Sequence, residues 1–314
     1  MNDFKQIKKL CCATNFEIAY ICDNFLIEHN YNPIRTFDYI YAEGNIPLML
    51  VAHMDTVLKR PPHPELIFYD QIKQVMWSPE GLGADDRAGI YAIMKLVEWC
   101  PENLRPHILF TTGEEIGGIG AELFIEDYTI PLKYIIELDR CGDNDCVFYN
   151  CDNPDFTSYI SSFGFIEEYG IFSDISVICP AWKTPGVNLS IGYNFEHSTR
   201  EMLSIKILNK TVNKVKKMIQ DIDNASYFQY IPAQNKPNYL IEYCYLCHSV
   251  QFLSEMTLVQ GDKSGAYIYV CPDCLSKKVK WCECCGQGYV SNDTNTKCFL
   301  CRKEPIIGYQ TSSI

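Results

Sequence analysis

The sequence has no long hydrophobic run. Nowhere do about 18 apolar residues follow one another, so we expect no transmembrane helix. The basic N-terminal stretch MNDFKQIKKL is not followed by an apolar segment long enough for a signal peptide. These absences predict a soluble protein of the cytoplasm.

An excess of positive charge is lacking as well. The 314 residues include 27 Lys and Arg against 39 Asp and Glu, which gives a formal net charge of −12. Nucleic acids and anionic membranes are themselves negative, so this charge argues against a general binder of either. The apolar share of 47% and the charged share of 21% are ordinary for a globular protein. We therefore expect no membrane partner.

Cysteine, in contrast, is abundant. The chain has 17, and nine of them fall between Cys244 and Cys301. An odd total without a secretory signal argues against a disulfide framework. The others show no repeating interval and are expected to be reduced and mostly buried, namely Cys11, Cys12, Cys22, Cys100, Cys141, Cys146, Cys151 and Cys179.

Up to about residue 225, short apolar runs alternate with amphipathic stretches of helical length. Apolar residues at helical spacing predict helices over 86–99 and 201–222. Uninterrupted apolar runs predict strands buried on both faces over 47–52, 107–112, 133–138, 175–179 and 187–191. This alternation predicts an α/β fold, a three-layer sandwich with a mainly parallel central sheet.

The pattern breaks at residues 226–240, SYFQYIPAQNKPNYL, where two prolines and several polar residues predict a linker. No internal repeat and no low-complexity segment precedes it. The sequence therefore predicts a first domain over 1–225, a cysteine-rich module over 241–305 and a tail over 306–314.

Polar motifs follow the predicted strands. They are HMD, with His53 and Asp55; GADDRAG, with Asp85 and Asp86; GEE, with Glu114 and Glu115; ELD, ending at Asp139; and the later NFEHS, with His197. In an open α/β sheet the carboxyl ends of the strands meet at the edge where ligands bind. We therefore expect these side chains to converge there.

Taken singly, each motif has a plain structural explanation. Asp85 and Asp86 would serve as caps at the start of a helix. Glu114 and Glu115 would serve as solvated turn residues, and His197 as a surface histidine. The ordered series of such sites, each at a strand end, makes coincidence the weaker explanation.

The series HMD, GADDRAG, GEE, LD and a late His resembles the zinc-dependent exopeptidase superfamily with co-catalytic metals. Leucyl-type aminopeptidases, glutamyl aminopeptidases and peptidase T are members of it, and GADDRAG is especially similar to the last two. The resemblance spans residues 53 to 197. It implies a metallopeptidase with a phosphorylase/hydrolase-like fold that hydrolyses peptide bonds.

The resemblance also implies a ligand set. His53, Asp85 and Asp139 would bind one metal, and Asp85, Glu115 and His197 the other, so that Asp85 bridges the pair. Imidazole and carboxylate ligands suit zinc, with manganese or cobalt as alternatives. In such a site two ions roughly 3.5–4 Å apart activate a water molecule and polarise the scissile carbonyl.

Further roles are implied around these ligands. Glu114 would be the general base, and Asp55 would orient the ring of His53. The peptide bond between Asp85 and Asp86 is expected to be cis. The gaps of about 30 residues between the HMD and DD motifs and 58 between the LD motif and the late His are too short for an inserted lid domain. The resemblance therefore implies the minimal catalytic fold.

Two residues are weaker candidates for substrate contact. Arg140 would bind a substrate carboxylate, although a structural salt bridge explains it equally well. Asp174, in the segment FSDIS, resembles a Ser-Asp pair near the pocket of relatives. Asp86 and Glu137 neighbour the expected ligands, and only the resemblance favours the ligands over them.

Beyond the linker, paired cysteines at short spacing predict two structural zinc sites of four cysteines each. Metal binding would fold such small segments. Cys284 is a spare that would either compete with Cys282 or stay free. The expected sites are Cys244, Cys247, Cys271 and Cys274, and Cys282, Cys285, Cys298 and Cys301.

The role of this double zinc ribbon stays open between docking a protein, supporting the fold and contacting nucleic acid. Lys277, Lys278 and Lys280 beside Trp281 offer modest charge next to an aromatic ring, as nucleic-acid contact requires. The acidic residues of the module roughly balance its basic ones, so we favour protein docking or structural support.

The sequence thus predicts an aminopeptidase that acts on peptides with two catalytic metals and carries two structural zinc ions. One alternative is an amidohydrolase that deacylates a non-peptide amide, because the same metal site serves both reactions. The other is a zinc-ribbon binding protein whose hydrolase domain is inactive or auxiliary. The presence of every expected ligand and of the base argues against the second alternative.

Overall fold

The computed structural model describes residues 2–233, 241–247, 250–252, 256–261, 267–291, 296–298 and 301. The chain divides into two compact units, Met1–Gln234 and Asn235–Ile314. No helix in the described part of the chain is both long and apolar enough to cross a bilayer.

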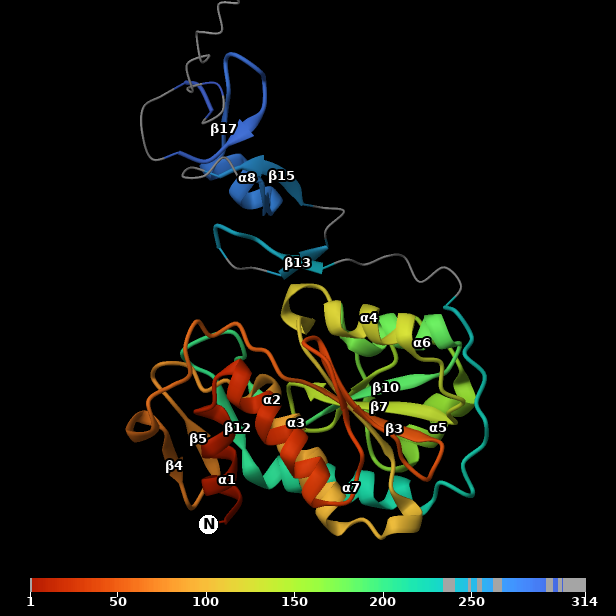
Figure 1. The fold of residues 1–314 in the computed structure, drawn as a ribbon. Coiled ribbons are helices and arrows are strands. Elements are labelled where there is room, and N and C mark those ends of the chain that lie inside the picture. Colours follow the sequence, from red (N-terminus) through yellow and green to blue (C-terminus); the bar gives the residue numbers. More distant parts are fainter. Residues whose placement is uncertain are drawn as a thin grey trace, which may run out of the picture. The chain divides into compact units, whose positions relative to one another are not determined.

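An eight-stranded sheet lies at the centre of the first unit, in the order β1-β2-β6-β3-β7-β10-β8-β9 (Figure 1). Its inner strands β6, β3, β7 and β10 run parallel. β2 and β8 join the two ends of this block antiparallel. The strands are β1 (Ile34–Arg35), β2 (Tyr39–Ala42), β3 (Leu48–His53), β6 (His107–Thr111), β7 (Tyr134–Arg140), β8 (Asp145–Val147), β9 (Ile166–Glu167) and β10 (Gly186–Ser190). The predicted α/β fold with a mainly parallel sheet is confirmed.

Helices cover both faces of this sheet (Figure 1). On one face α3 packs on β3, β7, α1 and α7, and the buried side chains of α2 join the same core. On the other face α4 and α6 pack together, with α6 against β7 and β10. The helices of this unit are α1 (Asn2–Cys11), α2 (Asn15–Glu28), α3 (Ala84–Trp99), α4 (Ile119–Asp127), α5 (Pro154–Ser162), α6 (Asp174–Trp182) and α7 (Ile205–Gln220).

A smaller antiparallel sheet, in the order β11-β12-β5-β4, flanks the central one. Its strands are β4 (Phe68–Asp70), β5 (Val75–Trp77), β11 (Tyr193–Asn194) and β12 (Met202–Ser204). The helix predicted over 201–222 therefore begins only at Ile205. Ser204 caps this helix, and Met202–Ser204 pair with β5 as strand β12.

One predicted strand is wrong. Residues 175–179 form the first half of α6, not a strand. Ser173 and Ser176 form a reciprocal capping box that starts a helix. Ile175, Ile178 and Cys179 then lie at helical spacing and are all buried. A short apolar run allows either structure, and here the cap decides for the helix.

Residues 226–233, within the segment predicted as linker, pack on the first unit. Pro232 forms a β-bridge with Cys151. The backbone N–H of Asp152 donates to the carbonyl of Ile231 at 2.8 Å. The ring of Phe228 packs at tilted and edge-on angles against the rings of Tyr134, Phe156 and Tyr159. Contacts of this kind extend the first compact unit past residue 225.

The second unit is small and has little apolar core. A four-stranded sheet has the order β16-β15-β18-β17, and a separate hairpin pairs β13 with β14. Its buried side chains include Met256, Val259 and Val270 together with cysteines. Its elements are β13 (Ile241–Tyr243), β14 (Val250–Phe252), β15 (Thr257–Gln260), β16 (Tyr267–Val270), α8 (Pro272–Lys278), β17 (Lys280–Trp281) and β18 (Gly288–Tyr289).

Candidate metal centre

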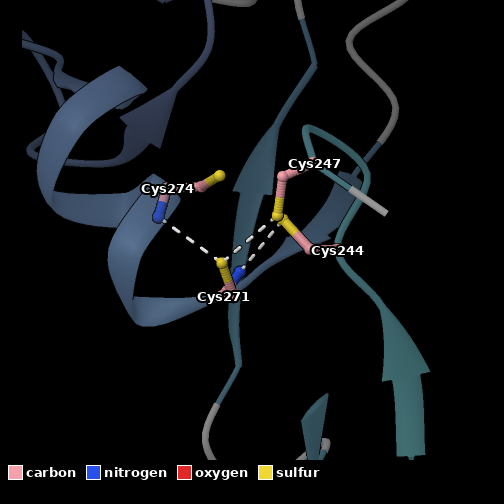
Figure 2. Close-up of side chains that lie close together, drawn as sticks. All are labelled: Cys244, Cys247, Cys271 and Cys274. Atoms are coloured by element: carbon pink, nitrogen blue, oxygen red, sulfur yellow. Dashed lines mark hydrogen bonds between the residues drawn. The ribbon is translucent and has the colours of Figure 1, made fainter. Parts of the chain in front are cut away.

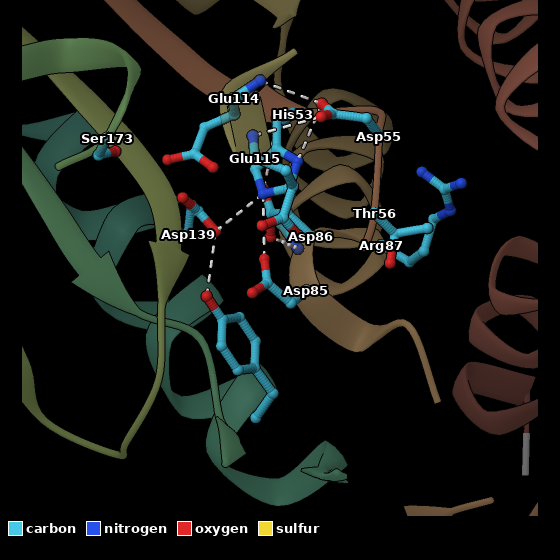
Figure 3. A network of polar contacts seen from close by, with 12 residues as sticks. His53, Asp55, Thr56, Asp85, Asp86, Arg87, Glu114, Glu115, Asp139 and Ser173 are labelled. Carbon is cyan, nitrogen blue, oxygen red and sulfur yellow. Dashed lines mark hydrogen bonds and ion pairs between the residues drawn. The ribbon is translucent and has the colours of Figure 1, made fainter. Parts of the chain in front are cut away.

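His53 ends strand β3 and lies at the middle of a polar cluster (Figure 3). It is only 1% exposed. Its Nε2 is 3.0 Å from Asp85 Oδ1 and 3.4 Å from Asp139 Oδ1. Its Nδ1 is 3.4 Å from Asp55 Oδ1. One ring nitrogen therefore faces the two expected ligands and the other faces the expected orienting carboxylate.

Asp85 lies between two imidazoles. It belongs to the first turn of α3, and its peptide bond to Asp86 is cis, as expected. While Oδ1 faces His53, Oδ2 is 3.1 Å from His197 Nε2. The same His197 nitrogen is 3.0 Å from Glu115 Oε2. The five residues expected to bind metal are thus brought together by the fold.

The neighbouring carboxylates are engaged differently. Asp86 is fully buried and accepts hydrogen bonds from the backbone N–H groups of His53 at 3.2 Å and Gly89 at 2.9 Å. Glu137 is fully buried and accepts a hydrogen bond from Ser173 Oγ. Asp85 and not Asp86 therefore faces both histidines, although the oxygens of Asp86 also lie close to His53 and Asp139.

Glu114 follows β6 in the short 3-10 helix η3 (Glu114–Ile116), and Figure 3 shows its carboxylate pointing toward Asp139. Gly113, at φ 77°, provides the left-handed turn that starts η3. Asp55 accepts the backbone N–H groups of Glu114 and Glu115, each at 3.3 Å. Asp55 therefore holds the turn that presents Glu114 and lies beside the Nδ1 atom of His53.

The electrostatics of the cluster favour a cation. Burial, together with the nearby Asp139 and Asp174 carboxylates, raises the pKa of Glu114 to about 9. Burial and the Asp85 carboxylate raise the pKa of Asp139 to about 7. Among the described residues, the buried Glu115 Oε1 has no hydrogen-bond partner. Converging carboxylates, two imidazoles and an unpaired oxygen fit divalent metal ions.

The weaker substrate candidates lie beside this cluster. Asp174 begins α6, is fully buried and accepts a hydrogen bond from Thr111 Oγ1. Burial raises the pKa of Asp174 to about 6. Arg140 ends β7 and is half-buried, and its Nε has no hydrogen-bond partner in the described part of the chain.

Glu201 is a functional residue that the sequence analysis missed. It is 2% exposed, and its carboxylate accepts the backbone N–H groups of Leu82 at 3.1 Å, Gly83 at 2.7 Å and Asp85 at 3.0 Å. It therefore ties the loop that presents Asp85 to the segment that carries His197. The sequence gives only its position four residues after His197, at the start of a predicted helix.

Tyr193 and Arg87 were missed as well. The Tyr193 hydroxyl donates to Asp139 Oδ1 at 3.0 Å. The fully buried Arg87 donates to the carbonyl of Met54 and, at 3.1 Å, to Asn15 Oδ1. Arg87 thereby holds the turn between His53 and Asp55 against the start of α2. The arginine of GADDRAG was the available signal for this contact.

The cysteines of the second unit form two clusters. Figure 2 shows Cys244, Cys247, Cys271 and Cys274 gathered around one point. Cys247 Sγ and Cys271 Sγ are 3.7 Å apart. Tetrahedral zinc with bonds of about 2.3 Å puts sulfur atoms about 3.8 Å apart, so this spacing fits a zinc site.

The second cluster consists of Cys282, Cys285, Cys298 and Cys301. Cys285 Sγ and Cys298 Sγ are 3.7 Å apart, and Cys282 Sγ accepts the backbone N–H of Cys298 at 3.3 Å. The spare Cys284 is exposed and lies outside this group. Cys282 is thus the residue that the fold places in the cluster.

Residues 41–162 match the model of Peptidase family M28. This segment contains His53, Asp85, Glu114, Glu115 and Asp139, and His197 lies beyond it. The match confirms the resemblance to zinc exopeptidases and the prediction of a metallopeptidase. No curated protein sequence matches the chain.

Solved structures share the fold at low sequence identity. The chain is similar to aminopeptidase PepT from Bacillus cereus, at 16% identity and TM-score 0.55, with 70% of this chain and 98% of that chain covered. The chain is also similar to a tripeptidase from Staphylococcus aureus, at 15% identity and TM-score 0.56, with 71% of this chain and 98% of that chain covered. An aminopeptidase from the archaeon Desulfurococcus kamchatkensis is similar at 13% identity and TM-score 0.56, with 72% of this chain and 98% of that chain covered. These similarities confirm the zinc-exopeptidase fold.

Proposed function

We propose that the protein is an aminopeptidase that uses two catalytic metal ions. The observation that carries this proposal is the placement of Asp85 between His53 and His197, at 3.0 and 3.1 Å. Each histidine has a second carboxylate beside it, Asp139 for His53 and Glu115 for His197. This symmetry supports two ion sites that share Asp85.

The donor set favours zinc, with manganese or cobalt as substitutes. When bound, such ions polarise the scissile carbonyl and make water a stronger nucleophile. Asp55, 3.4 Å from His53 Nδ1, holds the His53 ring so that Nε2 faces Asp85 and Asp139. The Tyr193 hydroxyl fixes Asp139 Oδ1 in the same way.

Glu114 is the general base of this proposal. Among the described residues neither His53 nor His197 forms an ion pair with Glu114, while the Glu114 carboxylate points into the cluster. Cations in the cluster would offset the carboxylates that raise the pKa of Glu114, and its ionised carboxyl would then take a proton from water and return it to the leaving amine. Because Asp55 holds the backbone on both sides of the Glu114–Glu115 bond, base and ligand keep a fixed relative position.

The two cysteine clusters bind one structural zinc ion each in this proposal. Thiolate pairs at tetrahedral spacing and the scarcity of apolar core both support it. We propose that the module docks a protein partner or supports the fold, because it offers a zinc-stabilised surface and little net positive charge.

The test is metal content measured together with hydrolysis of aminoacyl amides, dipeptides and N-acyl amides. We expect about four zinc ions per chain and cleavage of substrates with a free amino terminus. Glu114→Gln should lower kcat by about 10²- to 10⁴-fold. Glu126→Gln, the same change at an exposed position of α4, is the control.

Cleavage of N-acyl amides alone would replace the peptidase with an amidohydrolase. No turnover after zinc, cobalt or manganese is added would reject a catalytic role for the first unit. Unchanged kcat in Glu114→Gln would remove Glu114 from the reaction but leave the metal assignment standing.

A further inference from the structure

A groove of about 1040 Å³ adjoins the candidate metal centre. Its walls come from the start of α2, the turn between β1 and β2, and the loops after β3 and β6. Asp55 and Glu115 lie in its lining, so one end of the groove reaches the cluster described above. Pockets of this size hold small-molecule ligands in many proteins.

Large apolar side chains stand exposed around this groove. Phe37 is 100% exposed, Phe16 78% and Ile116 74%. Val57 and Ile119 line the same groove and are also exposed. Scattered exposed apolar residues need no explanation, but several around one concave surface mark a binding site.

The charges in the lining oppose an acidic ligand. Asp38 is the acidic residue of the lining outside the candidate metal centre, Asp55 and Glu115 belong to that centre, and Arg35 is basic. Arg35 NH1 is 3.7 Å from Asp23 Oδ2, so a carboxylate already neutralises its charge. The groove therefore repels acidic side chains and gives apolar ones a surface to cover.

We propose that this groove binds a large apolar side chain of the peptide substrate and sets a preference for aromatic or branched aliphatic residues next to the scissile bond. The inference rests on the proposed peptidase function, because Glu115 is the expected metal ligand at which the groove meets the candidate centre. Phe16 and Phe37 are the specificity-determining residues. Both belong to segments outside the metal-binding motifs.

The first experiment measures kcat/KM for peptides that carry Phe, Leu, Ala or Asp at one position on each side of the cleaved bond. In the wild type, kcat/KM for peptides with Phe or Leu should exceed kcat/KM for peptides with Asp at one of the two positions. Phe16→Asp and Phe37→Asp should lower the Phe and Leu values by about tenfold or more and leave the Ala values nearly unchanged. Ile72→Asp, at a 94% exposed site between β4 and β5, is the matched control.

The second experiment separates the groove from the reaction. Titration calorimetry follows the binding of Phe- and Asp-containing peptides to Glu114→Gln protein, with and without Phe37→Asp. If the wild type cleaves nothing but Phe37→Asp weakens binding of the Phe peptide, the groove stands and the peptidase proposal fails. If the wild type cleaves peptides and the groove variants keep its preference and binding, the groove proposal is overturned. The same holds if Phe37→Asp changes only the oligomeric state, which would identify a second copy as the occupant.

Discussion

The two compact units hold their candidate metal sites in opposite ways. In the first, nitrogen and oxygen ligands come from strand ends and loops that a large buried core positions. In the second, sulfur ligands make up much of the buried material themselves. In our proposal the first unit needs metal for its chemistry, whereas the second needs it for its fold.

The sharpest way to break this comparison is Asp85→Asn, which removes the shared ligand. We expect about two metal ions per chain instead of four, and kcat/KM at least about 10²-fold lower, since even residues that only orient ligands cost that much. Elemental analysis and peptide hydrolysis check this. A melting transition of the first unit equal to that of wild-type protein stripped of its metal is the control, and full metal content in the variant would refute Asp85 as the bridge.

Cys271→Ser tests the other half of the comparison. With one thiolate missing, the first cysteine cluster should lose its zinc, and amide hydrogens of residues 267–278 should exchange rapidly. Peptidase activity on dipeptides should stay within about twofold, because the catalytic ligands belong to the first unit. Cys284→Ser, outside both clusters, is the matched control. Slow exchange in Cys271→Ser protein would show that this unit folds without the site.

Glu201→Gln tests whether the loop that carries Asp85 must be held in place for the first unit to bind metal. The amide group presents one acceptor oxygen and directs N–H donors at backbone N–H groups, so the loop that carries Asp85 loosens. We expect metal affinity to fall by about 10- to 100-fold, measured by competition with a chelator. Excess metal should restore activity, and Glu126→Gln should change neither quantity. Activity that stays low at saturating metal would mean that Glu201 acts otherwise than by holding the loop.

Tyr193→Phe has the smallest expected effect. It removes a hydroxyl that donates to Asp139, and a side-chain hydrogen bond contributes about 1 kcal/mol net. Metal affinity should fall by about fivefold, and the fold should be unchanged. Tyr169→Phe, at an exposed position, is the control. An unaltered affinity would show that the backbone and Asn188 suffice to place Asp139.

The sequence motifs pointed to most residues of the candidate site, because metal binding needs particular types of side chain and these can be read from the sequence. The cis bond after Asp85 was available only through resemblance, and the structure has it. Glu201 could not be found in this way. Its function lies in three backbone N–H groups more than a hundred residues earlier in the chain, and a backbone amide leaves no mark in the sequence.

Local ambiguity explains the error in the fold. The run at 175–179 is equally apolar as a strand or as a helix, and the capping box at Ser173 and Ser176 decides it. The prediction that residues 201–204 are helical was wrong for a different reason. Its residues suit the helix that follows, but Met202 and Leu203 pair with β5 instead, a tertiary contact that overrides local preference.

By itself, the sequence determined the class of fold and the kinds of side chain that each candidate metal site offers, since these depend on periodicity and on side-chain type, whereas the individual ligand residues were expected from the family resemblance. Only the tertiary structure decided which carboxylates face the histidines, that Glu201 and Arg87 hold the loops in place, and that Phe16, Phe37 and Ile116 surround one groove. These properties are distances between segments remote in the chain, and packing alone sets such distances.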